Sequence, residues 1–106
     1  MKYYCVVELD ITDESWVQQY IQNVTKLVED SGGRYLARTA KIEKLEGARK
    51  APGIIVILEW PSREAAITFY ESEEYRPYRE SRIAGGRNEL LLVAGEDIAK
   101  VLNRVP

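Results

Sequence analysis

The first third of the chain contains two clear hydrophobic periods. Apolar side chains occupy every second position from Tyr3 to Ile11, which predicts a strand with one strictly buried face. Thr12 or Asp13 can cap the helix that follows, and Gly32-Gly33 supplies its left-handed stop. The apolar residues between these limits recur three and four positions apart and predict a helix of about four turns: Trp16, Val17, Tyr20, Ile21, Val24, Leu27 and Val28.

Two further strands are predicted to form an antiparallel hairpin. The first begins near Arg34 and extends at most to Leu45, and residues 46–53 then carry the Gly and Pro of a loop. The second, Ile54–Trp60, is the strongest strand pattern in the chain, and Pro61 ends it.

A second helical region and a last strand complete the pattern. Ser62 caps a helix, and residues 71–87, interrupted by Pro77, indicate a further short helix or helical turn. A strand over residues 89–94 follows. The buried stripe of the capped helix consists of Ala65, Ala66, Phe69 and Tyr70. The chain ends in an amphipathic stretch whose apolar face consists of Ile98, Val101, Leu102 and Val105.

The order of elements is β-α-β-β-α-β followed by a tail. This is the α+β, ferredoxin-like arrangement, in which a four-stranded antiparallel sheet carries its helices on one face. We expect residues 1–95 to form this single domain, since 106 residues leave no room for a second domain of ordinary size. Residues 96–106 are expected to form an amphipathic tail that packs on the same domain or on a dimer partner.

One side of such a sheet has no helices and must be solvated or covered by something else. Alternation places Glu8 on this open side, and a hairpin loop centred near residue 50 places Ala40 opposite Glu59. Arg38 then lies diagonally next to Glu59 on the same side. The apolar residues expected around these charges are Tyr4, Val6, Leu36, Ile55 and Ile57. Such a surface is best covered by a second copy of the chain, packed sheet to sheet, with the charges in an enclosed pocket.

Composition removes several classes of partner. The formal net charge is -2 and the two signs alternate along the chain, so neither nucleic acid nor anionic lipid is an expected partner. No run approaches the roughly 18 consecutive apolar residues of a membrane span. The N-terminal stretch reaches Glu8 too soon for a secretory signal, and we therefore expect a cytoplasmic protein.

The most informative count is that of histidine, which is zero. This excludes Ser-His-Asp and Cys-His nucleophiles, imidazole metal ligands and histidine acid-base catalysis. Cys5 is the single cysteine and is expected to face the helices as an inert buried thiol. No carboxylate or cysteine cluster has metal-ligand spacing, and no glycine-rich stretch matches a nucleotide-binding motif, so we expect neither a metal nor a cofactor.

Arg38 is the leading candidate for ligand binding, because a guanidinium on a semi-enclosed sheet face can hold a carboxylate or enolate through two hydrogen bonds. An ion pair with Glu59 is the structural alternative, and it would weaken Glu59 as a general base. Glu8 is the other candidate carboxylate, with a solvated strand-end charge as its alternative.

Tyr75 and Tyr70 are candidates to line a ligand pocket, with core or interface packing as the alternative. Three arginines recur every third residue and could attract an anion: Arg76, Arg79 and Arg82. We expect them to form a solvated, salt-linked face instead, because nearby glutamates neutralise much of their charge.

The motifs Gly32-Gly33-Arg34, Leu45-Glu46-Gly47 and Glu59-Trp60-Pro61-Ser62, with Phe69 to Tyr75 after them, resemble the DUF1330 family of uncharacterised bacterial proteins. The resemblance covers roughly residues 3–95, with Trp60 where phenylalanine is more usual. It implies a dimeric α/β-barrel similar to antibiotic-biosynthesis monooxygenases, muconolactone isomerases and YCII-like proteins. The family has no agreed reaction, so the resemblance supplies none.

These observations favour a homodimeric protein that holds an unknown small molecule between sheet and helices, with cofactor-free isomerisation, proton transfer or oxygenation as its chemistry. The alternative is a non-catalytic binding or assembly module, in which the same charges only fix the dimer register. A third interpretation is an accessory domain that docks on a larger enzyme through its tail. The same pocket chemistry serves an enzyme or a binding protein, and the sequence leaves that choice open.

Overall fold

A computed structural model describes residues 1–102. Its four strands form one antiparallel sheet in the order β2-β3-β1-β4, so the first and third strands are central. This is the strand order of the split βαβ, ferredoxin-like fold, and the predicted fold class is confirmed. The strands are β1 (Tyr3–Ile11), β2 (Arg34–Thr39), β3 (Ile54–Trp60) and β4 (Gly86–Ala94).

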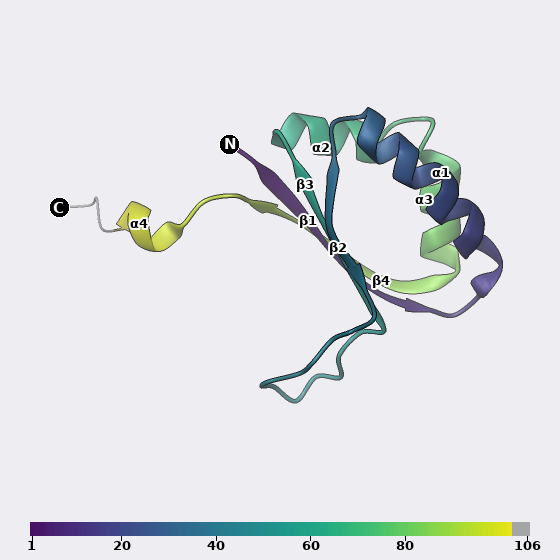
Figure 1. The fold of residues 1–106 in the computed structure, drawn as a ribbon, viewed down its shortest axis with the longest axis horizontal. Coiled ribbons are helices and arrows are strands. Elements are labelled where there is room, and N and C mark those ends of the chain that lie inside the picture. Colours follow the sequence, from purple (N-terminus) through teal and green to yellow (C-terminus); the bar gives the residue numbers. More distant parts are fainter. Residues whose placement is uncertain (103–106) are drawn as a thin grey trace.

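Three helices lie on one face of this sheet (Figure 1). A short 3-10 turn, η1 (Glu14–Trp16), connects β1 to α1 (Val17–Asp30). The segment between β3 and β4 forms α2 (Arg63–Tyr70) and α3 (Arg76–Ala84), so the predicted third helix is present. Within residues 1–102, no helix covers the opposite face of the sheet, as the element order predicts.

Local hydrogen bonds fix the ends of the helices. The Asp13 carboxylate accepts from the Ser15 amide at 2.9 Å before η1, and the Ser62 hydroxyl accepts from the Ala65 amide at 3.0 Å before α2. After α1, Gly32 has a φ of +95° and donates to the Glu29 carbonyl, while the next amide donates back to the Val28 carbonyl at 2.9 Å. These two bonds form a Schellman motif, which gives the predicted left-handed stop.

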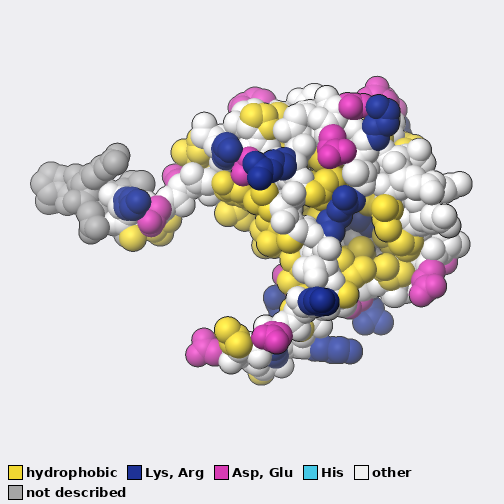
Figure 2. All heavy atoms as spheres, in the orientation of Figure 1, with side chains coloured by type: hydrophobic (Ala, Val, Ile, Leu, Met, Phe, Trp, Pro, Cys, Tyr) yellow, Lys and Arg dark blue, Asp and Glu magenta, His cyan; other side chains and the backbone are white. Residues whose placement is uncertain are grey.

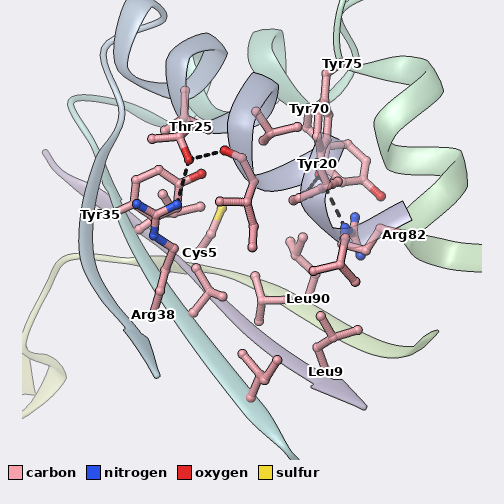
Figure 3. Close-up of a pocket in the computed structure, with 18 of the residues that line it drawn as sticks. Cys5, Leu9, Tyr20, Thr25, Tyr35, Arg38, Tyr70, Tyr75, Arg82 and Leu90 are labelled. Carbon is pink, nitrogen blue, oxygen red and sulfur yellow. Dashed lines mark hydrogen bonds between the residues drawn. The ribbon is translucent and has the colours of Figure 1, made fainter. Parts of the chain in front are cut away.

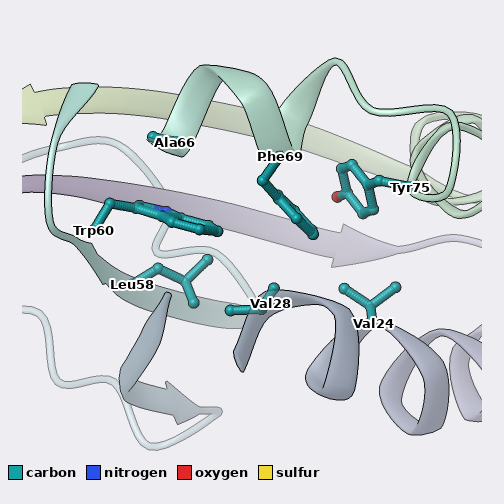
Figure 4. Close-up of a cluster of buried hydrophobic side chains, with 7 residues drawn as sticks. All are labelled: Val24, Val28, Leu58, Trp60, Ala66, Phe69 and Tyr75. Carbon is teal, nitrogen blue, oxygen red and sulfur yellow. The ribbon is translucent and has the colours of Figure 1, made fainter. Parts of the chain in front are cut away.

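The hydrophobic core lies between α1, α2 and the strand β3 (Figure 4). Trp60 is only 1% exposed and stacks at a tilt on Phe69, with 5.2 Å between the ring centroids. Val24 and Val28 of α1 close the other side of this cluster. The helical stripe of α1 and the helix-facing positions of β3 are therefore the buried ones, as their periods predict.

The predicted pairing of β2 with β3 is wrong. Tyr35 faces Leu58, but the next pair is Ala37 with Ile57, so Leu36 is an extra residue in a β-bulge. The bulge reverses the alternation after it, and Arg38 pairs with Val56 on the helix side of the sheet. Ala40 lies beyond the end of the strand and does not face Glu59.

Two segments extend away from the body of the molecule (Figure 1). Because β2 ends at Thr39, well before Leu45, residues 40–53 form a long loop that leaves the end of the sheet. The tail segment α4 (Ile98–Leu102) also stands apart from the sheet and the three helices, and Ile98 is 63% exposed. Val105 lies outside the described residues, and the packing of the tail on a partner chain stays a prediction.

Among the described residues, none of the helices has the length and apolar character that crossing a bilayer requires.

Candidate functional site

A cavity of about 300 Å³ lies between the helix-covered face of the sheet and the helices. Its floor is made by alternate residues of β1 and β3, and its walls by α1, α2 and α3 (Figure 3). Most of the lining is aliphatic or aromatic, and both tryptophans of the chain, Trp16 and Trp60, contribute to it. An apolar cavity with a few polar groups is the usual form of a small-molecule site.

Arg38 forms one polar group of the cavity, at its solvent-exposed side. Its Nη1 donates to the Thr25 hydroxyl at 2.7 Å, and its guanidinium lies 3.7 Å from the centroid of the Tyr35 ring. The Thr25 hydroxyl in turn donates to the Ile21 carbonyl at 2.6 Å (Figure 3). Stacking and a hydrogen bond therefore hold this arginine over α1 rather than over the open face.

Tyr20, Tyr75 and Arg82 form a second polar group, in which Tyr75 and Arg82 are buried and Tyr20 is half-buried. The two phenol oxygens are 2.6 Å apart, and Arg82 Nε donates to the Tyr75 oxygen at 3.4 Å. Arg82 Nη1 donates to the Asn88 side-chain oxygen at 2.7 Å, and the Asn88 amide donates to the Arg82 carbonyl at 3.0 Å. The Asn88 side chain thus connects β4 both to the Arg82 guanidinium and to the backbone at the end of α3.

Burial sets the protonation of the groups that could ionise here. It raises the pKa of the Tyr20 phenol well above its ordinary value, and the neighbouring Tyr75 raises it further, while Arg82 opposes the shift. Burial likewise raises the pKa of the Cys5 thiol and of the Tyr35 phenol. At neutral pH the Tyr20 and Tyr35 phenols and the Cys5 thiol are therefore protonated.

Three of the five sequence-predicted binding residues line this cavity: Arg38, Tyr70 and Tyr75. Tyr75 is 3% exposed and belongs to the core as well as to the cavity. Tyr70 is half-buried, and Arg79 covers its ring with 5.0 Å between guanidinium and centroid.

The other two residues, Glu8 and Glu59, lie on the open face and do not line the cavity. Glu59 pairs with Lys2 at 2.9 Å, and Glu8 pairs with Arg49 of the long loop at 3.3 Å. The expected cluster of Arg38 with both glutamates is therefore wrong. Its physical cause is the bulge at Leu36, which turns Arg38 toward the helices while the carboxylates stay on the other face.

Sequence reasoning missed the roles of Trp16, Tyr20 and Arg82. The helical spacing of Trp16 and Tyr20 predicts core packing, but Trp16 ends η1, Tyr20 lies on α1, and both line the cavity. Arg82 is 3% exposed and does not belong to a solvated face. The available signal was its spacing: Arg82 follows Tyr75 by seven positions, two helical turns, and so shares the buried side of α3.

This arrangement is suited to binding more than to acid-base chemistry. No carboxylate is among the residues that line the described cavity, and the chain has no histidine. Within residues 1–102, no three Cys, Asp or Glu side chains gather as a metal site would require. Its polar side chains can all donate hydrogen bonds: they belong to two arginines, two threonines, four tyrosines and two tryptophans.

The fold has solved relatives at low sequence identity. A protein of unknown function from Rhodopseudomonas palustris, RPA0582, matches with a TM-score of 0.76 and 15% identity, over 91% of this chain and 83% of that one. A dimeric ferredoxin-like protein of unknown function from Jannaschia sp. CCS1 matches with a TM-score of 0.69 and 10% identity, over 89% and 99% of the two chains.

A third similar structure has a described activity. SnoaB, a cofactor-independent oxygenase from Streptomyces nogalater, matches with a TM-score of 0.65 and 12% identity, over 91% of this chain and 94% of that one. At these identities the similarity shows a shared fold. No curated protein matches the chain by sequence. The family model for a domain of unknown function, DUF1330, matches residues 2–96, and the chain therefore belongs to the DUF1330 family.

Proposed function

We propose that this protein binds a small, largely aromatic molecule in the cavity between the sheet and the helices. The cavity itself carries this proposal: about 300 Å³ of space lined mainly by apolar and aromatic side chains, with its two charged groups at Arg38 and Arg82. This volume is at the lower end of the range for ligand pockets, which suits a molecule of one or two rings. Arg38 and Tyr70 contact the bound molecule from the sides of the cavity, and Tyr75 contacts it from the core.

A cofactor-free oxygenation is the second candidate. It is supported by the apolar walls, which would keep water from a reactive enolate, and by the fold shared with an oxygenase of this kind. In such a reaction a CH₂ group of the substrate becomes C=O, one atom of O₂ enters the carbonyl and the other leaves as water. The substrate supplies all four electrons and must ionise without a carboxylate base from the described cavity.

We also propose that the working unit is a pair of chains, joined through the open face of the sheet. Val6 of β1 lies between Ile57 of β3 and Leu91 of β4 on this face, and Leu91 is 58% exposed. Val6 and Ile57 are half-buried, and a partly exposed apolar row across three strands is typical of an interaction surface. The structural relative described as dimeric supports the same assembly.

Binding can be tested without knowing the natural ligand. In ¹⁵N-labelled protein, neutral 2-naphthamide should shift the indole N–H resonances of Trp16 and Trp60, because both rings line the cavity. Val56→Phe should weaken this binding at least about tenfold by filling the floor of the cavity. Ile83→Phe, at an exposed position of α3 outside the cavity, is the matched control and should bind like the wild type.

The opposite results have clear meanings. If folded wild-type protein shows no indole shift with naphthamide at millimolar concentration, the cavity does not take up aromatic molecules. The oxygenase candidate needs its own assay, which is O₂ consumption with an aromatic ketone that has an acidic CH₂ group. Equal consumption by the wild type and by Val56→Phe would refute catalysis in this cavity.

A further inference from the structure

The buried end of the cavity has an excess of hydrogen-bond donors. Arg82 is 3% exposed, and its Nη2 has no hydrogen-bond partner among the described residues. Its other two nitrogens are used, by the Tyr75 oxygen at 3.4 Å and by the Asn88 side-chain oxygen at 2.7 Å. Buried donors are normally satisfied, so an unpaired one that lines a cavity indicates a missing acceptor.

The two phenols add another donor to this excess. Tyr20 and Tyr75 have two hydroxyl hydrogens between them, and their mutual bond of 2.6 Å uses one. Arg82 Nε can only donate, so it occupies an oxygen lone pair and no hydrogen. One phenolic hydrogen therefore remains, and no acceptor for it is found among the described residues.

The charge of Arg82 is also uncompensated within the described part of the chain. None of the ion pairs found among the described residues involves Arg82. The neighbouring Tyr20 phenol is neutral at physiological pH, since burial raises its pKa. A buried cation without a carboxylate partner is costly unless an anion joins it.

We propose that Arg82, Tyr20 and Tyr75 bind the anionic oxygen of the ligand, so that the protein selects aromatic molecules carrying a carboxylate or an enolate. This proposal rests on the proposed function, because it assigns the ligand's acidic end within the same cavity. Arg82, Tyr20 and Tyr75 line the same cavity, so one acceptor group bound there can take both the free Nη2 hydrogen and the remaining phenolic hydrogen. Charge-assisted hydrogen bonds of this kind are the strong ones.

The proposal also orients the ligand. Its acidic group lies at the α3 side, between Tyr20 and Arg82, and its ring lies over the apolar floor formed by residues such as Cys5 and Val56. Arg38, held by Thr25 at the exposed side, then covers the opposite end. The two arginines have different roles, because Arg38 has a ring and a hydroxyl as partners whereas Arg82 has an unused donor.

A matched pair of probes tests this assignment. 2-Naphthoate and 2-naphthamide have nearly the same size and shape, but only naphthoate is an anion at pH 7. The wild type should bind naphthoate at least about tenfold more tightly, as expected for a charge-assisted bond to a buried guanidinium. The ¹⁵N-resolved Nε–H resonance of Arg82 should shift with naphthoate and much less with naphthamide.

Substitutions test whether Arg82 causes the preference for naphthoate over naphthamide. Arg82→Gln should remove the tenfold preference, whereas Arg76→Gln, the same change at an exposed position of the same helix, should keep it. Because Arg82 also ties α3 to Asn88, its replacement can affect folding. Tyr20→Phe is the second variant, which keeps the apolar volume and should lower the preference at least about threefold.

Each alternative result separates the two proposals. Equal affinity for both probes overturns the anion site and leaves the aromatic cavity intact. Failure of both probes to bind overturns the cavity proposal, and the anion site with it. A preference that disappears in Arg38→Gln but persists in Arg82→Gln overturns the assignment to Arg82.

Discussion

Gly33 has no space for a side chain. A methyl group at this position would lie 2.7 Å from Val28 Cγ1 and 2.9 Å from the Trp60 ring, two of the most buried side chains. We expect Gly33→Ala to lower the free energy of unfolding by about 1–3 kcal/mol, the usual cost of overpacking a core. Urea unfolding measures the change, and Ser31→Ala, two residues earlier and exposed, should alter it by less than about 0.5 kcal/mol. A Gly33→Ala protein as stable as the wild type would contradict this packing.

Tyr20 makes stability depend on pH in the alkaline range. Its pKa is raised above the ordinary value of 10.0, so the unfolded chain loses this proton first as the pH rises. The contribution to stability is therefore complete below about pH 10 and is lost as the pH rises toward the folded-state value, by up to about 1.4 kcal/mol per pH unit. Burial also raises the pKa of the Cys5 thiol above its ordinary value of 9.0, so this group likewise lowers stability as the pH rises above about 9.

The Tyr20→Phe variant should show a shallower loss of unfolding free energy between pH 10 and 11 than the wild type, since it removes one of these groups. Urea unfolding over this range measures it. Between pH 6 and 8 the difference between the two proteins should stay constant, because Tyr20 is protonated in both states. If the unfolding free energies of the wild type and Tyr20→Phe fall equally steeply above pH 10, the burial of the Tyr20 phenol is contradicted.

At the scale of single elements, the β2 bulge decides where Arg38 points. Without Leu36, the sequence Tyr35-Ala37-Arg38 would alternate regularly and keep Arg38 on the helix side. We therefore expect deletion of Leu36 to preserve the Arg38 to Thr25 contact and to change stability by no more than about 1 kcal/mol. Nuclear Overhauser contacts between Arg38 and the Tyr35 ring check the orientation. Their loss on deletion would mean that Leu36 does not act as the extra residue.

Strand β2 also shows which feature of the fold could not be predicted from the sequence. Periodicity predicted the strands, the buried side of α1 and the helix stop at Gly32, because these depend on local spacing and on one backbone angle. A bulge leaves no mark of that kind: Leu36 has ordinary strand chemistry, and only its pairing with β3 makes it the extra residue. One such residue was enough to move Arg38 to the other face.

The segment α3 shows a different limit. Its arginines recur every third residue, and their balance with nearby glutamates indicated a solvated face. Arg76 fits this interpretation, since it pairs with Glu73 and Glu80 at the exposed start of the helix. Arg82 does not, because α3 buries the side that it shares with Tyr75. Which turn of a short helix is buried depends on tertiary packing, which charge counting does not capture.

At the scale of the whole molecule, the chain is more extended than its length requires. Its radius of gyration is 15.5 Å, against roughly 13 Å for a compact domain of this size. The long loop and α4 account for the difference, and Figure 2 shows a hollow between the loop and the body of the molecule. Both segments extend beyond the uncovered sheet, where a second chain would give them a surface to pack on.

Leu91→Glu tests this assembly most directly. Leu91 lies beside Val6 on the open face and is 58% exposed in the single chain, so the substitution should hardly affect the fold of one chain while it places a charge within the proposed interface. We expect light scattering to give the mass of a dimer for the wild type and of a monomer for Leu91→Glu.

Ile83→Glu is the matched control, since Ile83 is 53% exposed on α3 and away from the sheet. It should remain a dimer, which separates a specific interface from a general effect of surface charge. If Leu91→Glu also stays dimeric, the two chains meet elsewhere and the open face needs another cover. If the wild type is itself a monomer at micromolar concentration, its exposed apolar row is not a self-association surface, and the cavity must then function within one chain.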